Sequence, residues 1–411
     1  MLTRASQVAT AVTRFTRASS TAAATATATS AATATVAPTP FSFEVLHRSR
    51  KPGSRARIGV IHTPHGDIET PAFVPVGVQL MFSNTYHLLV HPGPEVIEQA
   101  GGLHKFMGRR GPIITDSGGF QLFSLGQIER DENGDPIAEG GELKSRSQYS
   151  KEDQSCILSV SEEGAQFRSY RDGRLIMLTP ESSVQAQKAF GADIIIPLDE
   201  LPGNDVTGSR LSDSVARSHR WMARSLREHK TDVRGQAMYG VLHGGTDRAL
   251  RAESAQFLSE REFDGTAIGG SLGANRKEML GLLADIAPTL PDERPVHLLG
   301  IADEVSVISA SVYGIDTFDS CWPTRVARHG TLLTREGRIN IRATKFLTDF
   351  RHIEPSIPEL ADMTGCVTRA YMHHLFKQRE PLFTMLASMH NIAFMNWQMA
   401  RVREMIASDQ I

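Results

Sequence analysis

Cysteine is scarce in this sequence, and no two cysteines are close enough to form a Cys-x-x-Cys pair. The 411 residues contain only Cys156, Cys321 and Cys366. Three widely spaced thiols exclude a disulfide-stapled scaffold and a zinc ribbon built on cysteine pairs. They fit a protein of a reducing compartment.

Long apolar runs and a surplus of one charge are missing as well. No stretch approaches the roughly 20 consecutive apolar residues of a membrane-spanning helix, so we expect no membrane insertion. The formal net charge of −2 excludes a uniformly polybasic protein but leaves room for local basic stretches. With 40% apolar and 22% charged residues, the composition is that of a soluble intracellular α/β or α+β protein.

Acidic residues are missing from the N-terminal part of the chain, where Glu44 is the first. The segment carries Arg4, Arg14 and Arg17, followed by an Ala/Thr/Ser-rich run to about residue 40. This composition is typical of an organellar transit peptide. We therefore expect residues 1–40 to be a mitochondrial transit peptide and residues 41–411 to be the folded part. The alternative locations are the plastid and the cytoplasm. The alternative for the segment itself is a disordered tail without a function.

From residue 41 the chain alternates short apolar runs with amphipathic stretches. The apolar runs suit strands buried on both faces, and they lie at 72–76, 80–82, 112–115, 194–198, 237–242, 266–268, 297–301 and 314–318. Helical patterns cover 180–190, 211–229 and 247–260. Repeated β-α units with about eight strands predict an α/β fold of the (β/α)8 TIM barrel type. A doubly wound sheet is the competing architecture, but the glycine fingerprints that it usually carries are absent.

Two further elements are expected outside the repeated units. Residues 167–178 predict a hairpin with its turn at Asp172-Gly173. Residues 391–409 predict a terminal helix that packs on the barrel or on a second subunit. Its apolar face consists of Met395, Met399, Val402 and Ile406.

Polar residues follow the predicted strands at the points where the strands end. These segments are 116–121 (DSGGFQ), 199–200 (DE), 243–245 (HGG), 269–270 (GG), 300–303 (GIAD) and 319–325 (DSCWPTR). In a barrel all these ends meet at one rim, where barrel active sites lie. A single aspartate after a strand is usually a helix cap. Several carboxylates and glycine pairs in register favour a site.

The rim segments resemble a known family. DSGGFQ, HGG, IGG at 268–270 and FDSCWPTR at 318–325 resemble the signature segments of tRNA-guanine transglycosylases, also called queuine tRNA-ribosyltransferases. So do NTYHL at 84–88, RAYMHHLF at 369–376 and HN at 390–391. The resemblance runs in unbroken order from about residue 41 to the C-terminus. It implies a TIM barrel fold. It also implies a glycosyltransferase of the pentosyltransferase class that acts in tRNA modification and queuosine biosynthesis.

The resemblance implies that guanine at the tRNA wobble position is exchanged for a 7-deazaguanine base by means of two carboxylates. Asp319 would attack C1′ and form a covalent tRNA–aspartate intermediate, while Asp116 would act as general acid and then as general base. Asp199 would accept hydrogen bonds from the purine edge, and Phe120 would stack on the extruded base. The implied base-binding set is Asp116, Ser117, Gly118, Gly119, Phe120, Asp199, His243, Gly270 and Gly273.

Binding of tRNA is expected to rest on two family RNA-contact segments. They consist of Gly300, Ile301, Ala302, Asp303, Glu304, Val305 and Ser306, and of Thr324, Arg325, Val326, Ala327 and Arg328. A basic stretch continues them with Arg335, Arg338, Arg342 and Lys345, which by themselves would be a solvated face. The expected partners are tRNA with a GUN anticodon and queuine. Since the net charge is near zero, the basic patch is local and the affinity should fall steeply with salt.

The sequence departs from the family pattern in the first β-α unit. The family has a longer segment with a helix between its Pro-Val-Gly segment and the NTYH segment. Here Gly77 is followed almost at once by the apolar residues 80–82. We therefore expect a shortened first unit, with two strands joined tightly for a parallel crossover.

A second departure concerns zinc. The family's structural zinc is held by a Cys-x-Cys-x2-Cys pattern and a later histidine. The aligned positions here are Ile357, Glu359 and Asp362, with Cys366 out of register and His390 the only retained ligand. These side chains cannot build a tetrahedral thiolate site. We expect no metal at family affinity, and no cofactor is needed for the chemistry.

Two departures lie in the base pocket. His243 stands where the family usually has Gln, and an imidazole can supply one hydrogen bond to a purine edge but not both bonds of an amide. Gly273 stands where members with small substrates have valine, and glycine accompanies queuine, whose cyclopentenediol needs space. The alternative is that Gly273 serves only a left-handed turn.

Other function classes remain open. The chain could be a catalytically weak or inactive tRNA-binding accessory subunit of a transglycosylase heterodimer. Accessory chains typically keep the zinc site and lose the catalytic aspartates, which is the reverse of the pattern here. A barrel glycosidase that acts on free sugars gives the segment 324–328 no role. We expect a catalytic chain that forms a homodimer or a heterodimer with a related subunit.

Overall fold

The computed structural model describes residues 40–74, 79–119, 157–169, 171–203, 206–357 and 367–411. These residues group into two compact units. The larger unit comprises residues 39–321 and 398–411, and the described part of the smaller unit lies within 322–397. Phe120, Glu359, Asp362, Cys366 and the expected transit peptide lie outside the described residues.

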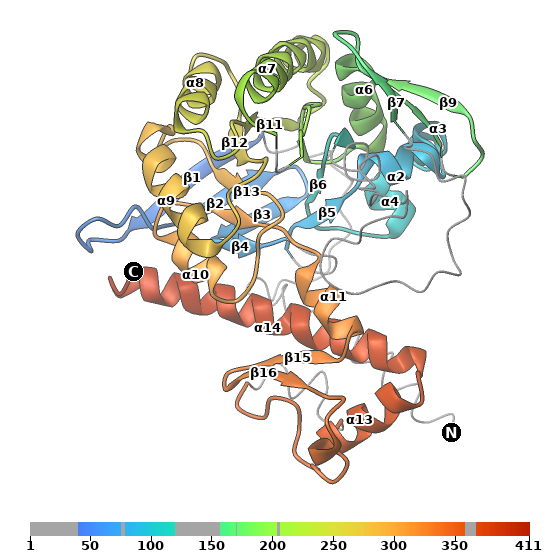
Figure 1. Ribbon diagram of the computed structural model, residues 1–411, viewed down its shortest axis with the longest axis vertical. Coiled ribbons are helices and arrows are strands. Elements are labelled where there is room, and N and C mark those ends of the chain that lie inside the picture. Colours follow the sequence, from blue (N-terminus) through green and yellow to red (C-terminus); the bar gives the residue numbers. More distant parts are fainter. Residues whose placement is uncertain (1–39, 75–78, 120–156, 170, 204–205, 358–366) are drawn as a thin grey trace, which may run out of the picture. The chain divides into compact units, whose positions relative to one another are not determined.

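A curled parallel sheet forms the centre of the larger unit (Figure 1). Its order is β4-β14-β13-β12-β11-β10-β6-β5, and every adjacent pair is parallel. The strands are β4 (Ala72–Phe73), β5 (Met81–Ser83), β6 (Ile113–Thr115), β10 (Ile194–Ile195), β11 (Ala237–Leu242), β12 (Gly265–Ile268), β13 (Val296–Leu298) and β14 (Thr317–Phe318). Each expected apolar run contributes one strand. The prediction of an α/β fold of the TIM-barrel type is confirmed.

Helices cover the outer face of this sheet in chain order (Figure 1). They include α6 (Pro180–Phe190), α7 (Gly208–Thr231), α8 (Arg248–Ser259) and α9 (Arg276–Ile286). Thr179 caps α6 by accepting a hydrogen bond from Ser182 N, and Asp247 caps α8 by accepting from Ala249 N and Leu250 N. The helices expected at 180–190, 211–229 and 247–260 are therefore confirmed. Shorter helices are α2 (Thr85–Val90), α3 (Pro94–Gln99), α4 (Leu103–Met107) and α10 (Ser306–Ser311), and a 3-10 turn, η1 (Ala287–Thr289), follows α9.

The first β-α unit is as short as the sequence suggests. Only residues 74–80 separate β4 from β5. These two strands stand at opposite ends of the hydrogen-bonded order, and no strand pairing joins them within the described residues. In a closed barrel every strand forms hydrogen bonds with a neighbour on each side. Among the described residues, the hydrogen-bonded sheet is therefore open between β4 and β5.

An antiparallel sheet that has no counterpart among the expected elements precedes the barrel. It consists of β1 (Ser42–Arg48), β2 (Arg57–Thr63) and β3 (Gly66–Thr70). Arg57 of β2 donates from Nε to Oδ1 of Asp316 at 2.9 Å and from Nη2 to Oδ2 at 2.6 Å. Both side chains are buried, and Asp316 immediately precedes β14. This bidentate pair fastens the small sheet to the barrel.

A second small sheet contains the expected hairpin. Its strands are β7 (Ile157–Val160), β8 (Ala165–Arg168) and β9 (Leu175–Leu178), and Gly173 adopts a φ of +72° in the turn between the last two. The positive φ explains the glycine after Asp172. The hairpin prediction is confirmed.

The smaller unit has an apolar core of its own. Its elements are α11 (Trp322–Arg328), β15 (Thr331–Thr334), β16 (Gly337–Asn340), η2 (Thr344–Phe346), α13 (Arg369–Lys377) and the first part of α14 (Pro381–Ala407). Leu332, Ile341, Phe346 and Met372 lie in that core.

The terminal helix α14 is longer than expected, but its predicted apolar face is confirmed. Met395, Met399, Val402 and Ile406 are each at most 1% exposed. The last residues belong to the larger unit, where Arg403 Nη1 donates to Pro71 O at 2.9 Å. The end of the helix thus packs on the barrel. Across the part of the chain that the structure describes, no helix has the length and hydropathy to cross a bilayer.

Candidate active site

Asp116 follows β6 at the carboxyl rim of the sheet and is surrounded by hydrogen-bond donors. Its Oδ1 accepts from Thr85 N at 2.8 Å and from Gly118 N at 3.1 Å, and its Oδ2 accepts from Asn84 Nδ2 at 2.5 Å. Burial raises the pKa of Asp116 to about 7, and the charges of Asp199 and Asp319 add to this effect, although the two backbone donors oppose it. A carboxyl group with a pKa near 7 can give or take a proton at neutral pH.

Ser117, which follows β6, and Asp199, which follows β10, are in direct contact. Ser117 Oγ donates to Asp199 Oδ1 at 3.2 Å and accepts from Gly119 N at 3.1 Å. His243, which follows β11, brings Nε2 to 3.2 Å from Asp199 Oδ2. All three side chains are almost completely buried. The structure therefore brings Asp116, Ser117, Asp199 and His243 of the predicted set together.

The glycines of the rim allow close approach of backbone segments. Gly118 has a φ of +83°, and a Cβ atom there would lie 3.1 Å from Tyr86 N. A Cβ atom on Gly119 would lie 2.8 Å from Asp199 O. Such distances exclude a side chain without a shift of the backbone, which explains the SGG motif. Gly270 has a φ of +72° and lies beside His243.

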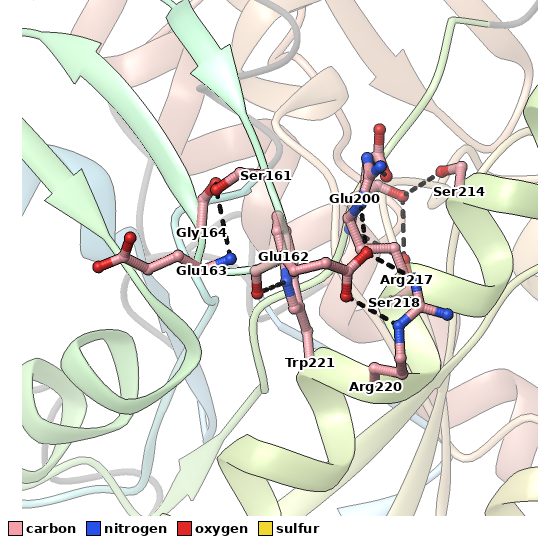
Figure 2. A network of polar contacts seen from close by, with 10 residues as sticks. All are labelled: Ser161, Glu162, Glu163, Gly164, Glu200, Ser214, Arg217, Ser218, Arg220 and Trp221. Carbon is pink, nitrogen blue, oxygen red and sulfur yellow. Dashed lines mark hydrogen bonds and ion pairs between the residues drawn. The ribbon is translucent and has the colours of Figure 1, made fainter.

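Glu200, the residue after Asp199, is fixed by a network of hydroxyl and guanidinium groups on α7 (Figure 2). Its backbone N–H donates to Ser218 Oγ at 3.0 Å, and its carboxylate accepts from Arg217 Nη1 at 2.8 Å. Glu162, in the turn between β7 and β8, binds Arg217 and Arg220, and the hydrogen bond from Arg220 holds the pKa of Glu162 at about 2. The network joins the hairpin sheet to the rim loop that carries Asp199.

Arg251 of α8 was not among the predicted site residues, although it connects two rim loops. Its guanidinium is completely buried and donates to three carbonyl oxygens, those of Leu242, Gly245 and Ser271, at 2.8–2.9 Å. Burial lowers its pKa to about 10. Because Leu242 and Gly245 flank His243 and Ser271 follows Gly270, Arg251 fixes both base-pocket loops. The sequence shows only an arginine within the predicted helix 247–260, and its burial became visible in the structure alone.

A pocket opens next to these loops. It is lined by Glu200, Pro202, Gly203 and Val206 of the loop after β10, by Leu211, Ser214 and Val215 of α7, and by His243, Gly244, Gly245, Thr246, Gly270 and Ser271. Of the predicted base-binding residues, His243 and Gly270 line it. Asp116, Asp199 and Gly273 do not.

Gly273 has a structural reason of its own. Its φ is +96°, and a Cβ atom there would lie 2.6 Å from both Cβ and Oε2 of Glu278. Glu278 Oε2 also accepts a hydrogen bond from Ala274 N at 2.9 Å. The turn therefore requires glycine whichever base is bound, and the glycine alone does not identify the substrate.

Asp319 follows β14 on the same rim. Its Oδ1 accepts from Gly300 N at 2.9 Å and lies 3.1 Å from His297 Nε2. The carboxylate is 16% exposed. His297, the first residue of the predicted strand 297–301, is a contact of this carboxylate that was not among the predicted site residues.

The loop 300–306 is ordered largely by its own polar groups. Asp303 Oδ1 accepts from Val305 N, Ser306 N and Arg276 Nη2 at 2.9–3.2 Å. Ala302 and Ser306 are buried, whereas Val305 is 44% exposed. Only part of this predicted RNA-contact segment is therefore open to a ligand.

In the smaller unit, the predicted RNA-contact residues 324–328 lie on α11. Arg325 and Arg328 are exposed, and Ala327 is buried. The guanidinium of Arg338 lies 4.5 Å from the ring centroid of Trp322, and that of Arg342 lies 5.2 Å from that of Phe376. These cations are exposed and supported by aromatic rings, so they can face a polyanion.

The residues described around the family's zinc position do not fit a thiolate zinc site. His390 is fully buried, its Nε2 donates to Leu333 O at 2.8 Å, and burial lowers its pKa to about 4. Its Nδ1 has no hydrogen-bond partner among the described residues. Ile357 is buried and offers no donor atom, and the Glu354 carboxylate accepts hydrogen bonds from Arg335 N and Ser356 N. One imidazole and an aliphatic side chain cannot replace three thiolates.

Comparison with known proteins decides the family. The sequence profile described as queuine tRNA-ribosyltransferase matches residues 52–145 and 144–411. The chain belongs to the queuine tRNA-ribosyltransferase family. It is accordingly an enzyme of the tRNA-guanine transglycosylase type, a glycosyltransferase.

Curated members of the queuine tRNA-ribosyltransferase family resemble the chain over nearly their whole length. A queuine tRNA-ribosyltransferase of Protochlamydia amoebophila is 48% identical over 390 residues, covering 91% of this chain and 97% of the relative. One of Chlamydia abortus is 49% identical over 383 residues, covering 90% and 99%. One of Chlamydia pneumoniae is 47% identical over 382 residues, with the same coverage. These relatives are bacterial and lend no support to the predicted mitochondrial location, which stays a prediction.

Proposed function

We propose that this enzyme exchanges guanine at the wobble position of tRNA with a GUN anticodon for queuine, through a covalent intermediate on Asp319. The names of the relatives support the tRNA substrate and the incoming base. The observation that carries the chemistry is the pairing of Asp116, with a pKa of about 7, and Asp319 on one rim.

In the first half-reaction an oxygen of Asp319 bonds to C1′ of the wobble nucleoside while the C1′–N9 bond to guanine breaks. The electron pair of that bond leaves with guanine, and Asp116 supplies the proton that neutralises it. The wobble base must first leave the anticodon stack, which costs little in a single-stranded loop. The products are free guanine, ionised Asp116 and a tRNA–aspartate ester.

In the second half-reaction Asp116 takes the N9 proton of the incoming base. N9 then bonds to C1′, the ester C1′–O bond breaks, and the electron pair returns to Asp319 as a carboxylate. Two displacements at one carbon retain the configuration of the glycosidic bond, as in retaining glycosidases. Asp199 accepts a hydrogen bond from Ser117 and lies 3.2 Å from His243 Nε2, and its carboxylate can accept two hydrogen bonds from the amide and amino edge of the base.

The tRNA itself is expected to bind through Arg325 and Arg328 on α11 and through the exposed part of the loop 300–306. Phosphate contacts of this kind make the affinity strongly dependent on salt. We further propose that zinc is absent or weakly bound and that the enzyme acts as a homodimer or heterodimer. The alternative function is a tRNA-binding accessory subunit without activity of its own.

An Asp319→Asn variant tests the proposal. Labelled guanine should no longer enter tRNA, whereas tRNA binding should persist, and the covalent complex that wild type forms without free base should vanish from denaturing gels. Asp285→Asn, an exchange of the same kind on the surface of α9, should leave the rate unchanged. Incorporation at the wild-type rate by Asp319→Asn would show that the nucleophile is assigned wrongly. Wild-type protein that binds tRNA but incorporates no guanine would favour the accessory subunit.

A further inference from the structure

His297 is a fully buried imidazole in contact with Asp319. It lies on β13, next to the strand that Asp319 follows, and its Nε2 is 3.1 Å from Asp319 Oδ1. Its other ring nitrogen, Nδ1, is 2.8 Å from Thr317 Oγ1. An imidazole whose two nitrogens both have partners is fixed in orientation.

The partners also indicate where the ring hydrogen lies. An ionised carboxylate can only accept, so Nε2 must carry the hydrogen that joins the two groups. Thr317 can donate its hydroxyl hydrogen to Nδ1, which completes the hydrogen bonds of a neutral ring. His297 therefore presents a fixed N–H donor to Asp319.

Both donors to Asp319 act on the same oxygen. Gly300 N donates to Oδ1 at 2.9 Å, beside His297 Nε2. Among the described residues no donor to Oδ2 is found. The two bonds oppose rotation of the carboxylate, since both are lost in orientations between one half turn and the next, so one oxygen faces the donors and the other is left without them.

We infer that His297 is a positioning residue that, together with Gly300, holds Oδ1 of Asp319 and makes Oδ2 the oxygen that bonds to C1′. This inference rests on the proposed role of Asp319 as the nucleophile. It adds to that proposal a choice between the two carboxylate oxygens and a residue that enforces the choice.

The position of these donors has a consequence for the two half-reactions. In the intermediate, Oδ2 is the ester oxygen bonded to C1′, and Oδ1 is the uncharged carbonyl oxygen. A hydrogen bond to a carboxylate is stronger than one to a neutral carbonyl, so His297 stabilises Asp319 as a leaving group. When N9 of the incoming base attacks C1′ and the C1′–Oδ2 bond breaks, Asp319 becomes a carboxylate again. Its negative charge is then stabilised by His297 Nε2 and Gly300 N, which already lie beside Oδ1. Loss of His297 should therefore slow the second half-reaction in particular and let the intermediate accumulate.

Two substitutions of His297 test this. His297→Phe removes the donor but keeps a ring, and it should lower kcat for guanine exchange about 10-fold to 100-fold, the range expected for a hydrogen bond to a charged group. The KM for tRNA should change little, and a larger fraction of the enzyme should be trapped as covalent complex on denaturing gels during turnover. His297→Gln carries an amide N–H near the position of Nε2 and should retain most of the activity.

His229→Phe is the matched control, because His229 is a buried histidine of α7 and belongs to no part of the proposed site. Melting temperatures of all variants separate loss of function from loss of folding. A folded His297→Phe enzyme with wild-type kcat would overturn the inference, and so would a folded His297→Gln enzyme as slow as His297→Phe. Exchange by Asp319→Asn would instead overturn the proposed nucleophile, so the two failures are distinguishable.

Discussion

Asn84 donates a hydrogen bond from Nδ2 to Oδ2 of Asp116 at 2.5 Å, so the residues that follow β5 and β6 are joined at the rim. The same asparagine caps α2 by accepting from His87 N at 3.0 Å. Donors to a carboxylate favour its charged form, whereas burial disfavours it. At Asp116 burial has the larger effect, and the pKa of about 7 expresses this balance.

The pKa of Asp116 predicts different pH responses of kcat/KM for the two substrates. Release of guanine needs protonated Asp116, so kcat/KM for tRNA should be level below pH 6 and fall about tenfold per pH unit well above 7. The second half-reaction needs ionised Asp116, and Asp319 is then an uncharged ester that no longer raises the pKa of Asp116. Therefore kcat/KM for the incoming base should not fall in this range. Initial rates with each substrate limiting, from pH 5 to 9, provide the measurement. Parallel profiles would argue against one residue in both roles.

Removal of the Arg251 guanidinium should disorder the two loops that carry His243 and Gly270 and so weaken binding of the incoming base. Arg251→Met leaves three buried carbonyl oxygens without their donor, and we expect KM for free guanine to rise about tenfold or more and the melting temperature to fall. The KM for tRNA should change less. Arg248→Ala, on the exposed side of the same helix, is the control and should behave as wild type. Equal changes in both KM values would point to a general loss of structure.

Substitution of Gly273 should impair exchange with every base. Valine would need a φ of +96° and a Cβ atom 2.6 Å from Glu278, so the turn before α9 must change. We expect similar losses with guanine, with a 7-deazaguanine base that carries only a small aminomethyl group, and with queuine, measured by competition for the same tRNA. A loss restricted to queuine would instead show that this position contacts the cyclopentenediol.

Zinc should be far below one equivalent per chain in purified protein, as measured by elemental analysis. His390 keeps one free ring nitrogen among the described residues, but Ile357 supplies no ligand. The triple variant Ile357→Cys, Glu359→Cys and Asp362→Cys restores the family's cysteine spacing and should bind about one zinc. Stoichiometric zinc in the unchanged chain would contradict this prediction.

The strand pattern could be predicted because buried parallel strands leave short apolar runs, and the rim could be predicted because their carboxyl ends meet. The lengths could not. The run 194–198 contributes only two strand residues, since Pro197 lacks an N–H and Ile196 N donates to the Gln187 side chain at 3.1 Å. Cross-strand hydrogen bonds, not composition, decide where such a strand ends.

Side chains that act through others escaped prediction for a similar reason. His297 and Arg251 are, in the sequence, one residue of a strand and one residue of a helix. Their importance depends on which atoms lie within about 3 Å of them in the fold. The family motifs predicted the catalytic aspartates. Only the folded structure shows which side chains hold those aspartates in place.

The opening between β4 and β5 bears on the stiffness of the site. Asp116 follows β6 and Asp319 follows β14, and in the sheet order the gap lies between these strands on one side. On the other side β10, β11, β12 and β13 connect them without interruption. In a closed barrel, hydrogen bonds between neighbouring strands would oppose an increase of the barrel's width in both directions around the sheet. Within the described residues, backbone hydrogen bonds between strands therefore connect the two carboxylates along one arc, through the four strands β10 to β13.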